Sequence, residues 1–229
     1  MEYAVIFLPL VGSIITYFGK RIGNLFSQVF SCLMVSVSAV LSFLIFYDGI
    51  TNGNYGNYVI FEWINSGNLN VNWSIKIDPL SSVMLMVVTS VSALVHIYSI
   101  GYMSHDPHKP RFMSYLSLFT FSMLCLVVSD NFLQLFFGWE GVGLCSYLLI
   151  GFWYKREAAN NAAIKAFIVN RVGDFGLAIG IFIIFLIFGT LNFDEIFPIV
   201  SDFTKTKLSI FGGEFEAITL ICVFLFIGA

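Results

Sequence analysis

Long apolar stretches separated by shorter polar segments dominate this chain. A membrane-spanning helix needs about 20 predominantly apolar residues, and the pattern predicts six complete spans followed by the start of a seventh. The six spans cover residues 3–18, 25–47, 80–103, 112–129, 131–154 and 162–188, and the seventh begins near residue 216. The expected fold class is therefore all-α, a polytopic transmembrane helix bundle.

The last apolar run continues to the final residue, Ala229, with no polar flank. A helix that stopped within the membrane would leave carbonyl groups without hydrogen-bond partners, which lipid does not tolerate. We therefore expect the sequence to be the N-terminal portion of a longer protein. Two regions are expected: residues 1–78 hold two spans and an outer hairpin, and residues 79–229 begin a bundle that is truncated within its seventh span.

Two polar connections are long enough to form structure of their own. Residues 48–78 contain the turn sequences Asn52-Gly53 and Asn54-Tyr55-Gly56 and stretches of alternating polar and apolar residues, which predicts a β-hairpin on the outer face. Residues 193–203 place Phe, Ile and Val on one side of a helix and three acids on the other. This pattern predicts a short amphipathic helix in the membrane interface.

Positive charges fall mainly on alternate connections. Those after the first, third and fifth spans carry most of the Lys and Arg residues, and cytoplasmic loops are enriched in these residues. We therefore predict that these loops face the cytoplasm or matrix and that the N-terminus faces outward. The inner set is Lys20, Arg21, Lys109, Arg111, Lys155 and Arg156, and the outer set is Lys76, Lys205 and Lys207.

Composition narrows the functional class. The chain is 58% hydrophobic and 11% charged, whereas soluble domains carry about 25% charged residues, so a water-soluble or disordered protein is excluded. The net charge is −3 with 11 Lys and Arg residues, which leaves no basic face for nucleic acid. The four Cys residues lie in apolar stretches without metal-binding spacing, so no metal site is expected.

Ionisable residues inside the spans are the candidate functional groups, because a charge at the membrane centre costs about 2.5–3.5 kcal/mol on insertion scales. Glu140 lies about 14 Å from the start of its span by helical rise. In the hydrocarbon core of a membrane an isolated carboxyl group favours its neutral form, whereas a nearby cation stabilises its ionised form. A carboxyl placed between these influences suits a proton relay, and the alternative is a structural carboxyl that bonds a neighbouring helix.

Further polar residues within the spans extend this set. Arg171 and Asp174 are three residues apart and can pair on one helix, either as a static clamp or as a switch in which Asp174 exchanges partners. Lys165 is a further relay candidate, although its long stem could instead reach the inner surface. His96 is either a hydrogen-bonded packing residue or a relay, and Gln134 could line a hydrated path beside Glu140.

Three glycines, Gly138, Gly141 and Gly143, surround Glu140. Small residues let membrane helices approach closely. The approaching helix could bring a Lys to Glu140, or the glycines could serve tight packing alone.

No sequence signature for a redox cofactor is present. The chain has no Gly-x-Gly-x-x-Gly after a strand, no P-loop, no Cys cluster and no paired-His arrangement. We therefore expect no flavin, nicotinamide, iron–sulfur centre or haem in this chain, and any associated redox chemistry would take place elsewhere.

Four segments together resemble the chain L and chain 5 family of antiporter-like subunits of respiratory complex I (NADH:quinone oxidoreductase). The resemblance covers essentially the whole chain, and the string Trp-Glu-Gly-Val-Gly is its most specific part. The segments are residues 137–153, 77–85, 165–174 and 189–193.

The resemblance implies a proton-translocating membrane-arm subunit that couples electron transfer from NADH to quinone to proton pumping. Residues 79–229 would begin the antiporter-like proton-channel bundle. The family's fifth-helix Glu matches Glu140, and its sixth-helix acid matches Asp174, with Arg171 beside it. In the family this Glu pairs with a Lys on the seventh helix, and the proton path continues through Lys residues on later helices, beyond Ala229.

The resemblance also implies the surroundings of the chain. Its expected partners are other membrane-arm subunits, the lipid bilayer and protons, with flavin and iron–sulfur centres in partner subunits. The expected location is the bacterial inner membrane, with the mitochondrial inner membrane as the alternative. Two other functions remain open, a subunit of a multi-subunit cation/proton antiporter and a passive membrane scaffold.

Overall fold

The computed structural model describes residues 1–19, 23–204, 206–210 and 213–229. Within these ranges five helices are long and apolar enough to span a membrane, and two further apolar helices are shorter. The all-α transmembrane bundle is confirmed, but α1, predicted as a complete span, has only 17 residues. The long helices are α2 (Asn24–Asn52), α3 (Pro79–Tyr102), α4 (Lys109–Val127), α5 (Phe132–Ile150) and α6 (Glu157–Phe188), and the shorter ones are α1 (Glu2–Phe18) and α8 (Ala217–Gly228).

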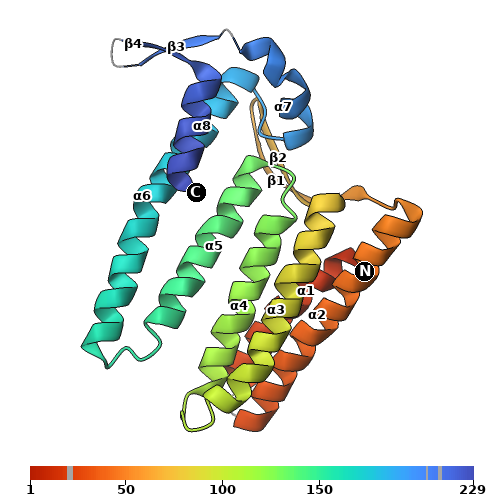
Figure 1. The fold of residues 1–229 in the computed structure, drawn as a ribbon, viewed down its shortest axis with the longest axis vertical. Coiled ribbons are helices and arrows are strands. Elements are labelled where there is room, and N and C mark those ends of the chain that lie inside the picture. Colours follow the sequence, from red (N-terminus) through yellow and green to blue (C-terminus); the bar gives the residue numbers. More distant parts are fainter. Residues whose placement is uncertain (20–22, 205, 211–212) are drawn as a thin grey trace.

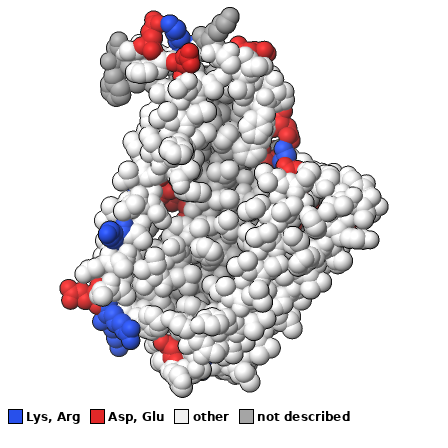
Figure 2. All heavy atoms as spheres, in the orientation of Figure 1, with Lys and Arg blue, Asp and Glu red and all other residues white. Residues whose placement is uncertain are grey.

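The helices form two connected groups (Figure 1). In the first group, helices α1 to α4 pack against one another. In the second group, α5 packs on α6 and α6 on α8, and α5 joins this group to the first through its contact with α4. On the face shown in Figure 2, charged side chains gather toward the two ends, and the belt between them is mostly uncharged. This distribution is the one expected of helices that cross a lipid bilayer.

The connections predicted to be on the same side do lie at the same end of the bundle. The α3–α4 and α5–α6 connections lie at the lower end in Figure 1, opposite the hairpins. Lys109 and Arg111 open α4, and Lys155 and Arg156 lie between α5 and α6, so these four residues share that end, called the inner end below. Lys20, Arg21 and Lys205 lie outside the described residues, and which membrane face each end meets stays a prediction.

Side-chain hydroxyl groups tie α2, α3 and α4 together inside the first group. Ser31 and Ser117 lie 2.7 Å apart, and Ser42 and Thr89 lie 2.6 Å apart, measured between their hydroxyl oxygens. His96 is fully buried; its Nε2 lies 3.1 Å from the Ser117 hydroxyl, and its Nδ1 lies 2.7 Å from the carbonyl oxygen one turn earlier. Interhelical hydrogen bonds of this kind stabilise membrane bundles. The contacts of His96 agree with its interpretation as a packing residue, and a relay role for it stays a prediction.

The predicted β-hairpin is confirmed, and its outer location stays a prediction. Strands β1 (Gly56–Ser66) and β2 (Leu69–Ile77) pair antiparallel, and Gly67, with φ of +59°, lies in the two-residue turn between them. The turn sequence Asn52-Gly53 ends α2, where Gly53 adopts a left-handed conformation with φ of +65°. Glycine is favoured at both positions because it has no Cβ to clash.

A buried polar group fixes the hairpin to the start of α5. The Gln134 amide donates to the carbonyl oxygen of Ser74 at 2.7 Å and accepts from its backbone N–H at 3.0 Å. Asp130 accepts hydrogen bonds from the Ser74 hydroxyl and from Asn57. Gln134 is fully buried, so the prediction that it lines a hydrated path beside Glu140 is wrong. Its amide satisfies the backbone of β2, as a buried amide must.

The second outer connection contains the predicted interfacial helix and an unexpected hairpin. Helix α7 (Phe193–Ile199) continues as a 3₁₀ turn, η2 (Val200–Phe203), so the predicted helix is confirmed with a tighter last turn. Asp194 of α7 pairs with Lys76 of β2. Strands β3 (Lys207–Ile210) and β4 (Gly213–Glu216) then pair antiparallel, and the sequence pattern did not predict this pairing.

Candidate functional site

An ion pair joins α5 and α6. Nη1 of Arg171, on α6, lies 2.5 Å from Oε1 and 2.6 Å from Oε2 of Glu140, on α5. Asn131 caps α5 by accepting a hydrogen bond from the backbone N–H of Gln134, which fixes where the helix starts and so how deep Glu140 lies. The resemblance implies a Lys beside Glu140 from the seventh helix, beyond Ala229, and among the described residues the cation that contacts Glu140 is Arg171.

A second carboxylate completes the group. Asp174 lies one turn after Arg171 on α6, and its Oδ2 is 3.6 Å from Nη1 of Arg171. The predicted Arg171–Asp174 pair is present, but the contact with Glu140 is the shorter one. We call these three residues the Glu140–Arg171–Asp174 cluster. With both acids ionised, one guanidinium faces two carboxylates, and the net charge of the cluster is −1.

The surroundings of the cluster are partly open. The side chains of Asp174, Glu140 and Arg171 are 10%, 23% and 48% exposed, respectively, and the guanidinium lies over the Phe167 ring, 4.7 Å from its centre. Asp174 lines a cavity of about 730 Å³ between α5, α6 and the end of α8. Charged side chains at this depth face protein or water rather than lipid, and the cavity places Asp174 against protein groups of α5, α6 and α8.

Lys165 does not join the cluster. It lies on the exposed side of α6, six residues before Arg171 and about 9 Å away along the axis by helical rise. Among the described residues, no ion pair includes its ammonium group. Its role in a relay therefore stays a prediction.

The glycines beside Glu140 serve different neighbours. A Cβ on Gly138 would lie 2.6 Å from the backbone nitrogen of Leu126, and one on Gly141 would lie 2.9 Å from the Ser122 hydroxyl. Both contacts are with α4, so the close approach packs α5 on α4 and brings no cation to Glu140. Gly143 instead faces α6, where the nearest atom to an added Cβ lies 3.8 Å away.

We expect Gly138→Ala to lower the free energy of unfolding by about 1–3 kcal/mol, the usual cost of overpacking. The added methyl group would meet the backbone of Leu126, and a helix backbone cannot yield without moving the helix. The measurement is thermal unfolding of the complete protein in mild detergent, followed with a dye that labels buried thiols such as Cys125 and Cys145. Gly143→Ala is the matched control on the same helix, and an equal loss in both variants would contradict the packing argument.

The Glu140–Arg171–Asp174 cluster consists of two carboxyl groups and one guanidinium group. Within the described ranges, no group of three or more His, Cys, Asp or Glu side chains could hold a metal ion. Arginine stays protonated in proteins, so the exchangeable protons of the cluster reside on its two carboxyl groups. A shared cation that moves between them would change the proton affinity of each.

Two family models match the chain. The N-terminal model of complex I chain 5 matches residues 63–113, and the transmembrane model of NADH:quinone oxidoreductase and Mrp antiporters matches residues 129–229. The first match ends near the start of α4, and the second contains the entire Glu140–Arg171–Asp174 cluster.

Curated relatives align over nearly the full chain. NADH-ubiquinone oxidoreductase chain 5 of Chondrus crispus is 53% identical over 231 residues, covering 100% of this chain and 34% of the relative. NADH-quinone oxidoreductase subunit L of Rickettsia felis is 50% identical over 225 residues, covering 98% of this chain and 34% of the relative. The chain thus spans about a third of the length of these relatives.

A solved structure shares the fold. A chain of the membrane-bound sulfane sulfur reductase, an archaeal respiratory membrane complex, superimposes with a TM-score of 0.82 over 100% of this chain and 44% of that one. Its sequence identity is 16%, so the comparison supports the arrangement of the helices alone.

Proposed function

Because this chain belongs to the family of complex I chain 5 and subunit L, and corresponds to the N-terminal portion of that subunit, we propose that it carries part of a proton-translocating path. It is a multi-pass inner-membrane protein, with bacterial and mitochondrial relatives. In our proposal it works beside other membrane-arm subunits, and NADH oxidation and quinone reduction take place at flavin and iron–sulfur centres in those partners.

The observation that carries the proposal is the position of one guanidinium between two carboxylates. Nη1 of Arg171 contacts Glu140 at 2.5 Å and lies 3.6 Å from Asp174. A small movement of the Arg171 side chain toward Asp174 would strengthen the second contact and break the first. Glu140 would then lack a counter-ion in a medium of low dielectric constant and would take up a proton on a carboxylate oxygen. The return of Arg171 would expel that proton.

The energies involved are suitable for coupling to a membrane potential. Moving one elementary charge across 100 mV costs about 2.3 kcal/mol. A change of two pK units in a carboxyl corresponds to about 2.7 kcal/mol. The making and breaking of one buried contact can therefore offset the cost of moving one proton across such a potential.

Cations outside the cluster have roles in this proposal as well. The Lys that family members carry on the seventh helix would approach Glu140 from the remainder of the protein and add a second, movable counter-ion. Lys165 would act toward the inner end of α6, as a group through which protons approach the cluster. Arg171 would hold the resting state, because its contact with Glu140 lies within this chain.

Asp174→Asn in the complete complex tests the proposal. Asparagine keeps the size of the side chain but cannot attract Arg171 as an ion, so partner exchange should fail. We expect proton uptake in sealed vesicles to fall about tenfold, the factor that corresponds to one lost pK unit of charge interaction, with the complex still assembled. NADH oxidation is measured separately in the same vesicles.

The exposed Asp202, on η2, gives the matched control Asp202→Asn, which should leave both rates unchanged. Loss of assembly together with both rates would favour a passive scaffold. Sodium-dependent transport without NADH would favour a cation/proton antiporter. Normal proton uptake in an assembled Asp174→Asn complex would rule out the exchange mechanism.

A further inference from the structure

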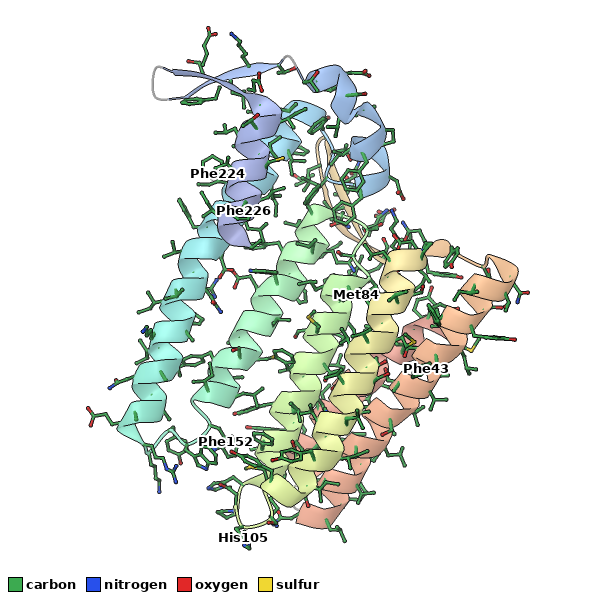
Figure 3. All side chains as sticks on the ribbon, viewed as in Figure 1. Phe43, Met84, His105, Phe152, Phe224 and Phe226 are labelled. Atoms are coloured by element: carbon green, nitrogen blue, oxygen red, sulfur yellow. The ribbon has the colours of Figure 1, made fainter. Side chains whose placement is uncertain are left out.

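A second cavity lies at the inner end of the bundle, where α4, α5 and α6 meet. Its volume is about 430 Å³, which falls within the range of small-ligand sites. None of its lining residues belongs to the Glu140–Arg171–Asp174 cluster. Figure 3 labels Phe152, which lines the cavity, near the lower ends of α4 and α5. The polar and aromatic lining residues are Arg111, Tyr115, Tyr147, Phe152, Tyr154 and Asn160.

Arg111 is the charged group of this cavity, and it is incompletely paired. Its Nη2 donates a hydrogen bond of 2.9 Å to the carbonyl oxygen of Phe152, whereas its Nε is buried and has no partner among the described residues. The guanidinium carbon lies 4.6 Å from the ring centre of Phe152 and 5.3 Å from that of Tyr154. The aromatic rings therefore fix the plane of the guanidinium while leaving donors available.

No carboxylate among the described residues lies within ion-pair distance of Arg111. The neighbouring acid, Asp106, is held by Trp153 Nε1 at 2.9 Å and by the backbone N–H of His108 at 2.7 Å. Burial raises the pKa of Asp106, but these hydrogen bonds and the charges of His108 and Arg111 outweigh it and hold that pKa below its usual value. Asp106 is thus an ionised group committed elsewhere, and it leaves Arg111 without a contacting counter-ion.

The missing partner is best matched by a phosphate group. A buried donor without an acceptor is costly; a water molecule would satisfy one N–H but would leave the charge uncompensated. The planar fork of a guanidinium matches phosphate oxygens in a bidentate manner, and phenol groups of Tyr side chains are further donors. Leu148, Ala163 and Ile164 supply an apolar wall, which a soluble anion would not require.

The position of the cavity indicates where such a phosphate comes from. Arg111 lies in the first turn of α4, and Gly151 to Tyr154 follow the end of α5, so the cavity lies where spanning helices reach the lipid headgroups. Lys109, Lys155 and Arg156 lie at the same end, and basic residues beside a membrane attract anionic lipids. We propose that the Arg111 cavity binds the phosphate of an anionic phospholipid from the leaflet that this end faces.

The test places a photoreactive side chain in the cavity. Tyr154→p-benzoylphenylalanine is introduced into the complete protein within its complex, which is reconstituted in nanodiscs with radiolabelled phosphatidylglycerol or with phosphatidylcholine of the same acyl chains. We expect preferential crosslinking of phosphatidylglycerol. The same probe at Tyr98, an exposed residue of α3, should crosslink both lipids equally.

Charge variants then assign the site to Arg111. In the probe background, Arg111→Gln should lower phosphatidylglycerol crosslinking about tenfold, because a charge-assisted hydrogen bond is lost, and Arg111→Lys should retain part of it. Arg156→Gln is the matched control, since Arg156 stacks on Trp153 and does not line the cavity. NADH oxidation and the thermal midpoint of unfolding verify that each variant folds. If Arg111→Gln does not fold, Arg111→Lys and the comparison of the two lipids still test whether the cavity binds an anionic lipid.

Three results would overturn the proposal. Equal crosslinking of both lipids at Tyr154 would show that the cavity does not select negative charge. An equal loss in Arg111→Gln and Arg156→Gln would indicate a diffuse surface effect rather than a site. Competition by inorganic phosphate alone that removes the phosphatidylglycerol signal would assign the cavity to a soluble anion.

Discussion

Glu140→Gln is expected to lower proton translocation about hundredfold or more, the range supplied by a positioned proton-transfer group, while the complex stays assembled. Glutamine has nearly the same shape, so α5 should still pack on α4 through Gly138, but it can neither carry the proton nor attract Arg171 as an ion. Arg171 would then have only the Asp174 carboxylate, now 3.6 Å away, and would stay with it. The state in which Arg171 pairs with residue 140 would be lost, so the proposed exchange could not take place.

The measurement is proton uptake into vesicles per NADH oxidised, with assembly followed on native gels. Glu157→Gln is the matched control, because Glu157 is an exposed residue in the first turn of α6 and has no ion-pair partner among the described residues. Full proton uptake in an assembled Glu140→Gln complex would show that this carboxyl is a packing group.

Helix positions could be predicted from the sequence because the membrane imposes length and hydropathy on every span. The apolar run at 80–103 corresponds closely to α3 (Pro79–Tyr102), where Asp78 caps the helix and a Pro opens it. The span predicted at 162–188 begins five residues after the start of α6, because the helix begins at Glu157 and its first turn is polar. Hydropathy identifies the part of a helix that lies in the hydrocarbon core of the membrane, whereas the hydrogen-bonded helix continues into the interface.

The short elements outside the membrane were harder to predict because their signals are local. In β3, Lys207 and Ser209 alternate with Leu208, a weak strand pattern of four residues. Asn52-Gly53 fits a hairpin turn and a helix end equally well, since both use a left-handed glycine. In the structure Asn52-Gly53 forms a helix end, because α2 continues to Asn52.

The candidate cluster was predicted in its members but not in its connections. Pairing rules along one helix find Arg171 and Asp174, which are three residues apart, but they cannot find Glu140 on the preceding helix. Depth could have indicated the contact: Glu140 lies 10 residues before the end of α5, and Arg171 lies 14 residues after the start of α6. By helical rise these positions differ by only about 6 Å in depth, within reach of an Arg side chain.

The second large effect is expected for Arg171→Gln, which leaves Glu140 and Asp174 close together without their shared cation. Proton uptake should be lost as in Glu140→Gln, but the complex should also be destabilised by about 1–3 kcal/mol, because Glu140 loses a charged hydrogen-bond donor and Asp174 loses its ion-pair partner. Arg171→Lys should recover part of the stability, since it keeps the charge but replaces the planar fork with a single ammonium. Thermal unfolding and native gels measure both variants.

A double-mutant cycle separates the ion pair from other effects of these substitutions. The variant Arg171→Gln/Glu140→Gln removes both charges, so we expect it to be more stable than Arg171→Gln alone, with a coupling energy above about 1 kcal/mol. The exposed pair Lys207–Glu214, 3.0 Å apart on β3 and β4, serves as the matched cycle, and its coupling should stay within the usual surface range of about 0.2–1 kcal/mol. Additive effects of the Arg171 and Glu140 substitutions would mean that the ion pair has no coupling free energy and so could not drive a proton relay. Strong coupling together with lost proton uptake would place stability and transport in the same contact, as expected if a resting ion pair must break for each proton that moves.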